Sequence, residues 1–290
     1  MHIRSTTKLA AVLIVKNESK VIERCLKSIV GVDEIIVLDT GSTDQTESIC
    51  IKNRAKVFHD VWRDDFAEAR NKAISYCTCD WILSIDADEY VTPGTIDFIK
   101  SYIQTTKGEV LTCHVRTEET LSVQPRIFKR DLSRIYWKGE AHNWINRQAD
   151  GHVNIEITST SEGWSHNNDP DRGIRIMKSF LKRNPNAQRE RYYLGKEYMS
   201  KCQYELALFH FTEVCDSYPS PEGRADIHLS MAKAYIHLER MRQAINHLHE
   251  SLKIDPDIGE CYRLLHRLTK KGIYAQCAKL AKGQQLIKDV

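Results

Sequence analysis

Hydrophobic and polar positions along the first third of the chain predict strands and helices in alternation. The run Leu9–Val15 is continuously apolar, as a strand buried on both faces requires. In Glu18–Val30 the apolar residues recur at helical spacing. Further along we expect strands at Glu34–Leu38, Ala55–His59 and Trp81–Ile85, and helices that start at Ser42, cover Phe66–Tyr76 and open at Pro93. This alternation predicts an α/β layer with a mixed, mostly parallel sheet.

The pattern changes twice in the rest of the chain. From about Gly108 to His166 strand-like pieces alternate with polar loops, and from about Asp169 the pattern is helical to the end. Within the helical part, Tyr198, Ala207 and Pro219 recur 37 residues later as Tyr235, Ala244 and Pro256. Such a recurrence predicts stacked helical hairpins. We therefore expect an α/β domain over residues 1–168 and an all-α domain over residues 169–290.

Composition narrows the class of protein. Of the 290 residues 41% are hydrophobic and 28% charged, as in an ordinary globular protein. No stretch approaches the roughly 20 apolar residues that span a bilayer, so we expect no membrane span. The nine cysteines are an odd number and are scattered singly, apart from Cys77 and Cys79. This usage favours a reducing cytoplasm, which would be the host's cytoplasm if the chain is phage-encoded.

The net charge of +3 conceals an asymmetry along the chain. From Arg172 to the end there are 21 Lys and Arg against 13 Asp and Glu, whereas acidic residues are in excess before Arg172. The densest basic stretch is Arg172–Arg191. A stretch of this kind is either a solvated helix face or a surface for an anionic partner such as nucleic acid.

The segment D-W-I-L-S-I-D-A-D-E carries the most informative chemistry. Asp86 and Asp88 follow a predicted buried strand, and open α/β sheets bind ligands beyond the carboxyl ends of their strands. Carboxylates are oxygen ligands that Mg²⁺ and Mn²⁺ prefer, and a metal held by one or two of them has room for phosphates. A divalent ion also neutralises the charge on a departing diphosphate. The sequence therefore predicts a Mn²⁺ or Mg²⁺ site at this strand end.

Three more segments accompany D-A-D-E. V-K-N-E-S follows the first strand, D-T-G-S-T-D-Q-T follows the second, and A-R-N-K lies in the helix before D-A-D-E. In this order and at these separations the four segments resemble the family 2 glycosyltransferases with the GT-A fold, over about residues 8–166. The motif L-G-x-x-Y at Leu194–Tyr198 resembles the tetratricopeptide repeat. The first resemblance implies an enzyme that transfers a sugar, with inversion, from a nucleotide sugar such as a UDP-hexose.

The resemblance also implies which residues form the site. The nucleotide sugar would contact Asn17, Glu18, Asp39, Arg70, Asn71, Asp86 and Arg126, with Asp39 on the pyrimidine ring. Asp88 would coordinate the metal, Asp86 would approach the ribose and the metal, and His142 or His166 would be a third metal ligand. Many relatives have His-Glu where this chain has His142-Asn143, so one candidate catalytic base is absent. Glu140, two residues upstream, is the base that we expect in its place, so that Glu140 and Asp88 are the expected catalytic residues.

The acceptor stays open at this level. The layout resembles sublancin-type S-glycosyltransferases, which modify a peptide cysteine, and phage-encoded enzymes that act on hypermodified DNA bases. The basic C-terminal part favours DNA, with a hydroxymethyl-type base as the acceptor. A Cys or Ser side chain of a peptide or protein and a lipopolysaccharide-type glycan are the alternatives. A non-catalytic binding module built on the repeats would not need D-A-D-E.

Overall fold

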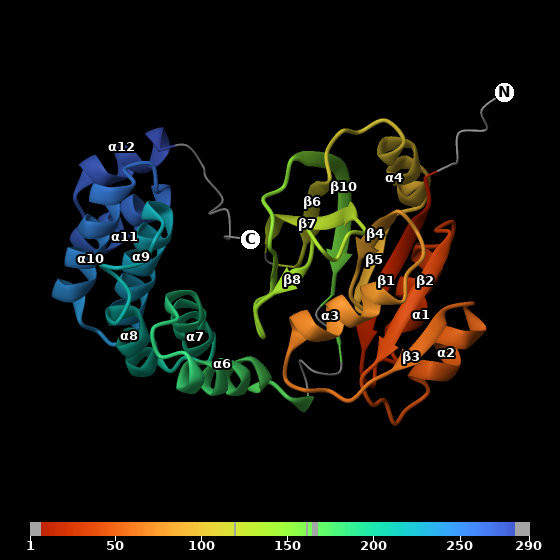
Figure 1. Cartoon of the computed structure of the whole chain (residues 1–290). Coiled ribbons are helices and arrows are strands. Elements are labelled where there is room, and N and C mark those ends of the chain that lie inside the picture. The colour runs from red at the N-terminus through yellow and green to blue at the C-terminus, as the bar shows by residue number, and fades with distance from the viewer. Residues whose placement is uncertain (1–6, 119, 161, 164–167, 282–290) are drawn as a thin grey trace. The chain divides into compact units, whose positions relative to one another are not determined.

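The computed structural model describes residues 7–118, 120–160, 162–163 and 168–281 (Figure 1). These residues divide into two compact units, one that ends at Arg172 and one that begins at Gly173. The first is an α/β unit and the second is all-α, which confirms the predicted fold class. Across these described residues, no helix is both long enough and apolar enough to span a membrane.

An eight-stranded mixed sheet forms the centre of the first unit, in the order β3-β2-β1-β4-β7-β6-β10-β5. Its strands are β1 (Leu9–Val15), β2 (Glu34–Asp39), β3 (Lys56–His59), β4 (Trp81–Ser84), β5 (Glu89–Val91), β6 (Val110–Arg116), β7 (Leu121–Lys129) and β10 (Gly151–Ser159). Strands β3, β2, β1 and β4 are parallel, whereas β7 runs antiparallel to β4 and β6. Two short strands, β8 (Trp137–Lys138) and β9 (Trp144–Ile145), pair separately.

The order of the parallel strands fixes where a ligand can bind. The chain runs from β1 outward through β2 to β3 and then crosses to β4, on the other side of β1. Because β1, β2 and β4 are parallel, their carboxyl ends meet at one edge of the sheet. The connections leave this edge in opposite directions, and such a switch point is where open α/β sheets hold their ligands.

Helices cover both faces of this sheet. They are α1 (Ile22–Ser28), α2 (Thr46–Lys52), α3 (Phe66–Ser75) and α4 (Thr95–Ile103). Alternate residues of β1 belong to two different cores: Leu9, Ala11, Leu13 and Val15 pack with α1 and α4, whereas Ala10 and Val12 pack with α3. Strand β1 is therefore buried on both faces, as its apolar run predicts.

The predicted start of the second helix is wrong. Helix α2 begins at Thr46 and not at Ser42, and the residue before it, Gln45, makes no side-chain cap. Ser42 stays in the loop because its backbone N–H donates to Oδ1 of Asp39, and its Oγ accepts from the N–H of Asn17. The same loops shorten α1, which begins at Ile22. Hydrogen bonds within and between the loops after β1 and β2 therefore keep Ser42 from capping helix α2.

The second unit consists of paired helices. They are α6 (Arg172–Arg183, which begins in the first unit), α7 (Gln188–Ser200), α8 (Tyr204–Thr212), α9 (Pro221–His237), α10 (Met241–Ile254), α11 (Gly259–Thr269) and α12 (Gly272–Leu280). The repeated alanines, Ala207 on α8 and Ala244 on α10, are fully buried. Gly195 of L-G-x-x-Y lies against the ring of Phe211, which a methyl group at that position would approach to 2.6 Å. The recurring small residues therefore mark close helix packing.

Candidate active site

A cavity opens where β1, β2 and β4 end. Its polar lining consists of Lys16, Glu18, Thr40, Arg70, Asp86, Asp88 and Arg172. Four residues named from the sequence, Glu18, Arg70, Asp86 and Asp88, thus lie around one space. The other residues that were expected at the nucleotide sugar (Asn17, Asp39, Asn71 and Arg126) do not line this cavity.

The carboxylates of Glu18 and Asp88 converge beside Gly163. A methyl group built on Gly163 would lie 3.5 Å from Oδ2 of Asp88 and 3.5 Å from both carboxylate oxygens of Glu18. The backbone of Glu18 is fixed by its N–H, which donates to Oγ1 of Thr46 at 2.7 Å. On the other side, the backbone oxygen of Asp88 accepts from the N–H of Thr160. Both carboxylates therefore lie beside Gly163 in the lining of this cavity, and carboxylate oxygens are ligands that Mg²⁺ and Mn²⁺ prefer.

Asp86 belongs to a network of charges that is buried except at Asp86 itself, which is half-buried. Its Oδ1 lies 2.8 Å from Nη2 of Arg70, and its Oδ2 lies 3.6 Å from Nη1 of Arg126. Arg126 comes from β7 and also pairs with Glu89 at 2.6 Å. The loop closes on itself because the N–H of Asp86 donates to the Glu89 carboxylate at 2.8 Å. Through its contacts with Asp86 and Glu89, Arg126 therefore holds the D-A-D-E loop in position.

The pKa values of the two acids in this network, Asp86 and Glu89, are shifted in opposite directions. Burial alone would raise the pKa of Asp86, but the guanidinium groups of Arg70 and Arg126 outweigh it and lower the pKa to about 2. Burial raises the pKa of Glu89 to about 7, and the neighbouring Asp86 adds to this effect while Arg126 opposes it. Asp86 is thus a carboxylate whose charge is already balanced by two arginines.

Asp39 and Asn17 shape the loops around the cavity. Oδ1 of Asp39 accepts from the backbone N–H groups of Gly41 and Ser42, at 2.9 and 2.7 Å. Asn17 has a left-handed backbone (φ 57°), and its Oδ1 accepts from the N–H of Thr43 at 2.7 Å. The bonds of Asn17 join the loop after β1 to the loop after β2. If Asp39 recognises the pyrimidine, as the resemblance implies, its Oδ2 is the atom left for that contact.

Asn71 contacts the backbone of Trp137 instead of the cavity. Its Oδ1 accepts from the N–H of Trp137 at 2.8 Å, and its Nδ2 donates to the carbonyl of Trp137 at 2.9 Å. Helix α3 is in this way fastened to β8. The guanidinium of Arg70, the preceding residue, lies 5.0 Å from the centre of the Trp137 ring. In the A-R-N motif, Arg70 therefore lines the cavity, and Asn71 holds helix α3 against β8 through two hydrogen bonds.

A second cavity shares Phe66, Arg70 and Asp86 with the first. Its remaining lining comes from β7 and from the β8–β9 turn: Gln124, Pro125, Arg126, Trp137, His142 and Asn143. His142 has a left-handed backbone (φ 46°) and lies in this second lining, away from Glu18 and Asp88. Glu140 lines neither cavity, although its carbonyl accepts from the N–H of Phe66. His166 lies outside the described residues.

The first cavity has an aromatic wall that none of the sequence motifs predicted. Trp62 and Phe66 line it together with Arg172, whose guanidinium lies 4.7 Å from the Phe66 ring centre and 5.6 Å from that of Trp62. Cation–π contacts of this geometry are favourable. The signal was the pair of aromatic residues just before A-R-N, but no local pattern joins them to Arg172 across more than a hundred residues.

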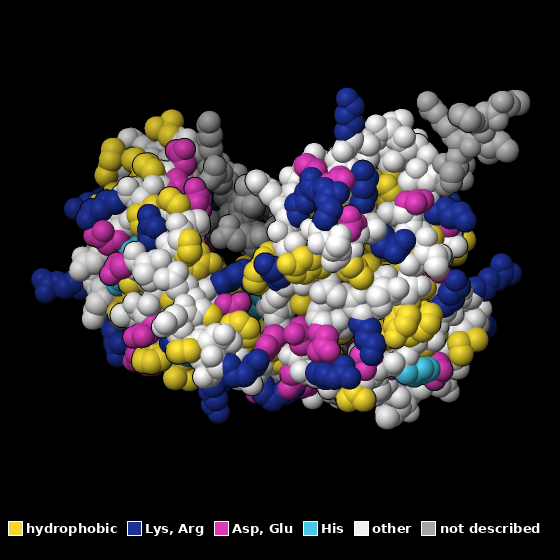
Figure 2. All heavy atoms as spheres, in the orientation of Figure 1, with side chains coloured by type: hydrophobic (Ala, Val, Ile, Leu, Met, Phe, Trp, Pro, Cys, Tyr) yellow, Lys and Arg dark blue, Asp and Glu magenta, His cyan; other side chains and the backbone are white. Residues whose placement is uncertain are grey.

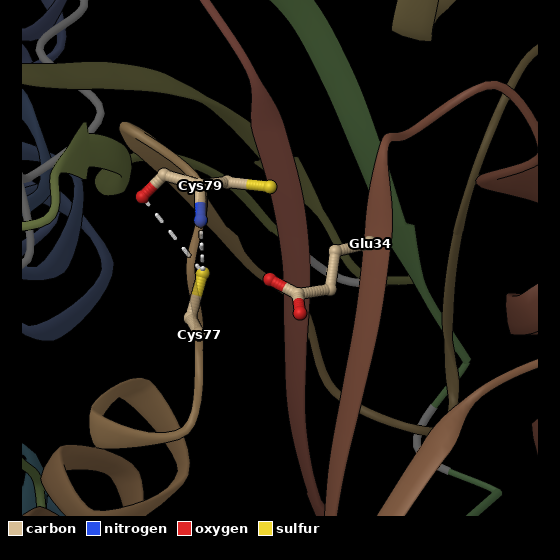
Figure 3. A group of neighbouring side chains, drawn as sticks. All are labelled: Glu34, Cys77 and Cys79. Carbon is tan, nitrogen blue, oxygen red and sulfur yellow. Dashed lines mark hydrogen bonds between the residues drawn. The ribbon is translucent and has the colours of Figure 1, made fainter.

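Glu34, Cys77 and Cys79 form a buried cluster near the start of β2 and β4, at the opposite edge of the sheet (Figure 3). Among the described residues, this is the one group of three His, Cys, Asp or Glu side chains whose ligand atoms lie within 4.8 Å of one another. The Glu34 carboxylate already pairs with Lys56 at 2.7 Å and accepts from the N–H of Thr78 at 2.8 Å. Burial raises the thiol pKa of Cys77 to about 12 and that of Cys79 to about 11, so both are protonated at neutral pH. Hydrogen bonding accounts for this cluster without a metal.

Comparisons with known proteins identify relatives of the chain. It is 42% identical over 125 residues to a TPR repeat-containing protein of Synechococcus elongatus, which covers 43% of this chain and 30% of that protein. It is 45% identical over 86 residues to the SPbeta prophage-derived glycosyltransferase SunS of Bacillus subtilis, covering 29% of this chain and 20% of SunS. The chain thus spans less than a third of the length of these curated relatives.

A solved structure and a family model complete the comparison. S. aureus TarS 1–349 in complex with UDP-GlcNAc aligns over 94% of this chain and 91% of that one, with 17% identity and a TM-score of 0.49. The model of glycosyl transferase family 2 matches residues 10–154, half of the chain. This match includes the strand ends that form the first cavity, and it confirms the family that the four motifs predict. The chain belongs to glycosyl transferase family 2.

Proposed function

We propose that this protein is a metal-dependent glycosyltransferase that moves a hexosyl group from a nucleotide sugar, a UDP-hexose, to a polymeric acceptor. The observation that carries the proposal is the gathering of Glu18, Arg70, Asp86 and Asp88 around one cavity at the switch point of the sheet. Membership of family 2 supports the reaction class. The hydrogen-bonded loops that carry Asn17 and Asp39 support a nucleotide site, because Oδ2 of Asp39 is left for a contact with the pyrimidine.

Asp88 and Glu18 are the residues that we propose for the metal, Mn²⁺ or Mg²⁺. The ion would neutralise the charge that develops on the departing diphosphate. Their convergence beside Gly163 supports this assignment, and diphosphate or water oxygens suit the other ligand positions. Asp86 would act next to the metal with its own charge balanced by Arg70 and Arg126.

The transfer that we propose is a direct displacement. An acceptor oxygen attacks the anomeric carbon from the side opposite the diphosphate, so that the new glycosidic bond forms as the bond to the diphosphate breaks. The acceptor proton passes to a base, for which we propose Glu140. What supports Glu140 is its position on the β8–β9 turn, two residues from His142 of the second cavity.

Donor hydrolysis tests this proposal without knowledge of the acceptor. The protein is incubated with a panel of UDP- and dTDP-hexoses, with Mn²⁺, with Mg²⁺ or with EDTA, and nucleotide release is followed. We expect release from at least one UDP-hexose, in the presence of metal alone. If no donor is hydrolysed and calorimetry detects no UDP binding with either metal, the chain is not a transferase, and a binding module on the repeats becomes the better account.

For the acceptor we propose DNA that carries a hydroxymethyl-type base. Helix α6 contains no acidic residue, and its Lys178 and Lys182 are exposed four residues apart, on one face. Lys and Arg side chains, dark blue in Figure 2, protrude at the position that α6 occupies in Figure 1. A basic helix face of this kind supports contacts with phosphates. A Cys or Ser side chain of a peptide is the second candidate, which the resemblance to the sublancin-type enzymes favours.

Salt-dependent binding separates these acceptors. For duplex DNA, the affinity should fall by about tenfold or more between 50 and 200 mM salt, since each phosphate contact releases counterions. The double change Lys178→Glu with Lys182→Glu should weaken binding, whereas Lys279→Glu on α12 should leave it unchanged. A protein that binds no DNA at low salt but glycosylates a Cys or Ser peptide would overturn the DNA assignment.

A further inference from the structure

Helix α1 joins the loop that carries Glu18 to the loop that carries Asp88. At the start of the helix, the backbone N–H of Ile22 donates to the carbonyl of Glu18 at 2.9 Å. One turn further on, the thiol of Cys25 donates to the carbonyl of Asp86 at 3.4 Å. The two carboxylates that we propose for the metal therefore belong to loops that are fixed to the same short helix.

Arg24 of this helix binds the residues that follow β10. Its Nη2 donates to Oγ1 of Thr160 at 2.7 Å and lies 2.8 Å from Oε2 of Glu162. Its guanidinium also lies 5.1 Å from the centre of the Tyr90 ring, on β5. An exposed ion pair contributes little to the stability of a fold by itself. The consequence of these contacts therefore lies in the residues that Arg24 holds in place.

The residues that Arg24 holds lie directly against the two acids. Both the N–H and the hydroxyl of Thr160 donate to the backbone carbonyl of Asp88, at 3.3 and 3.1 Å. Thr160 thus connects the guanidinium of Arg24 to the backbone of Asp88 through a continuous chain of hydrogen bonds. Gly163, the residue after Glu162, is buried and lines the first cavity together with both acids.

Gly163 leaves free a space that a side chain would fill. A methyl group there would lie 3.5 Å from Oδ2 of Asp88 and from both carboxylate oxygens of Glu18. Gly163 is not one of the glycines with a positive φ, so its backbone conformation is open to alanine. A divalent ion held by two carboxylates also needs positions for water or diphosphate oxygens. The backbone therefore does not require glycine at this position, whereas a metal site beside these acids does.

We propose that Arg24 is a positioning residue of the metal site, which keeps Asp88 and the bare backbone of Gly163 where a divalent cation can bind beside them. The inference rests on the proposed function, because it concerns the ion that Glu18 and Asp88 would hold. Arg24 lines neither cavity and acts through Thr160 and the residues that follow it. Loss of a group that orients metal ligands typically weakens metal affinity by about 10–100-fold.

Mn²⁺ binding to the intact protein in the presence of UDP tests the proposal, with free Mn²⁺ followed by electron paramagnetic resonance. Arg24→Met should weaken the Mn²⁺ affinity by about tenfold. The direction of the change is informative, because loss of a nearby positive charge would by itself strengthen the binding of a cation. Arg24→Lys keeps a cationic hydrogen-bond donor and should recover part of the affinity. Arg116→Met removes another exposed Arg–Glu pair with the same distance of 2.8 Å, away from both cavities, and should leave the affinity unchanged.

Matched glycine variants test the space beside the acids. Gly163→Ala should weaken Mn²⁺ binding by about tenfold or more, because its methyl group takes space that ligand oxygens need. Gly173→Ala places a methyl group equally close, at 3.5 Å, to the carboxylate of Glu197, outside both cavities, and should leave Mn²⁺ binding unchanged.

The outcomes separate this inference from the proposed function. Unchanged or tighter Mn²⁺ binding in Arg24→Met, or unchanged binding in Gly163→Ala, would overturn the inference. If Asp88→Asn lost Mn²⁺ binding in the same series, the proposed function would still stand. Failure of the wild-type protein to bind Mn²⁺ in the presence of UDP would remove both.

Discussion

The guanidinium of Arg126 lies 2.6 Å from the carboxylate of Glu89, and both side chains are buried. The pair joins β7 to β5, and the loop that carries Asp86 and Asp88 ends at Glu89. Because the N–H of Asp86 also donates to Glu89, the carboxylate fixes this loop at both of its ends. The position of Asp86 and Asp88 therefore depends on an arginine that follows Glu89 by 37 residues in the sequence.

Loss of this arginine should destabilise the fold. Arg126→Met leaves Glu89 buried without its partner, and removal of one partner of a buried ion pair typically costs about 3–5 kcal/mol. We expect a decrease of that size in the free energy of unfolding, measured by urea denaturation at pH 7. Arg116→Met is the matched control, because Arg116 pairs with Glu156 on the surface and both are well exposed. Equal midpoints for the two variants would mean that Arg126 does not hold the loop.

Asn71 should act through Trp137. Asn71→Ala removes two hydrogen bonds to the Trp137 backbone, and we expect a loss of about 1–3 kcal/mol in stability. Asn71→Asp keeps an acceptor for the N–H of Trp137 but has no donor for the Trp137 carbonyl. Its stability should therefore lie, at best, between those of the wild type and Asn71→Ala. Transfer to the acceptor should weaken in both variants while UDP affinity is retained. A selective loss of UDP affinity would instead place Asn71 at the nucleotide sugar, as the family resemblance implies.

Glu34 should make stability depend on pH in the acid range. Burial opposes ionisation of its carboxyl group, but Lys56 and the N–H of Thr78 outweigh this effect and lower the pKa from 4.5 to about 2. The folded-state pKa is depressed, so the stabilisation is complete above about pH 5 and is lost as the pH falls toward 2. Glu34→Gln should cost roughly 1–2 kcal/mol at pH 7, since the exposed Lys56 is screened by solvent. Urea titrations should show wild type and variant converging between pH 5 and pH 2; a constant difference would disprove this role.

Gly195 should tolerate no side chain. A methyl group there would meet the Phe211 ring at 2.6 Å, and overpacking of this kind costs about 1–3 kcal/mol. Gly195→Ala should therefore lower the thermal midpoint of the all-α unit in calorimetry. Gly272→Ala, which meets nothing within 4 Å, is the control and should leave the midpoint unchanged or slightly higher. If both variants melt alike, α7 and α8 do not pack as closely as described.

The elements with strong local signals were predictable from the sequence. Strand β1 was found at its true limits because an uninterrupted apolar run leaves few alternatives, and the 37-residue recurrence revealed helix pairs whose small residues are buried. The start of α2 was not predictable, because Ser42 is held in the loop by Asn17, 25 residues away, as well as by Asp39.

Part of the site was also predictable from the sequence. Glu18, Asp86 and Asp88 stand at strand ends, and strand order alone brings them together. The structural roles of Arg126 and Asn71 depend on pairing with Glu89 and Trp137, which no spacing along the chain encodes. Motif resemblance placed both residues near the substrate without revealing what they hold.

The proposed function depends most on the metal-binding role that we propose for Asp88. Asp88→Asn changes one oxygen for nitrogen and preserves size, so the fold should survive while UDP-hexose hydrolysis with Mn²⁺ falls by about a hundredfold or more. Asp97→Asn, on the exposed first turn of α4, is the control and should keep the full rate. A folded Asp88→Asn protein that releases UDP at the wild-type rate, or a wild-type protein that does so in EDTA, would contradict the account.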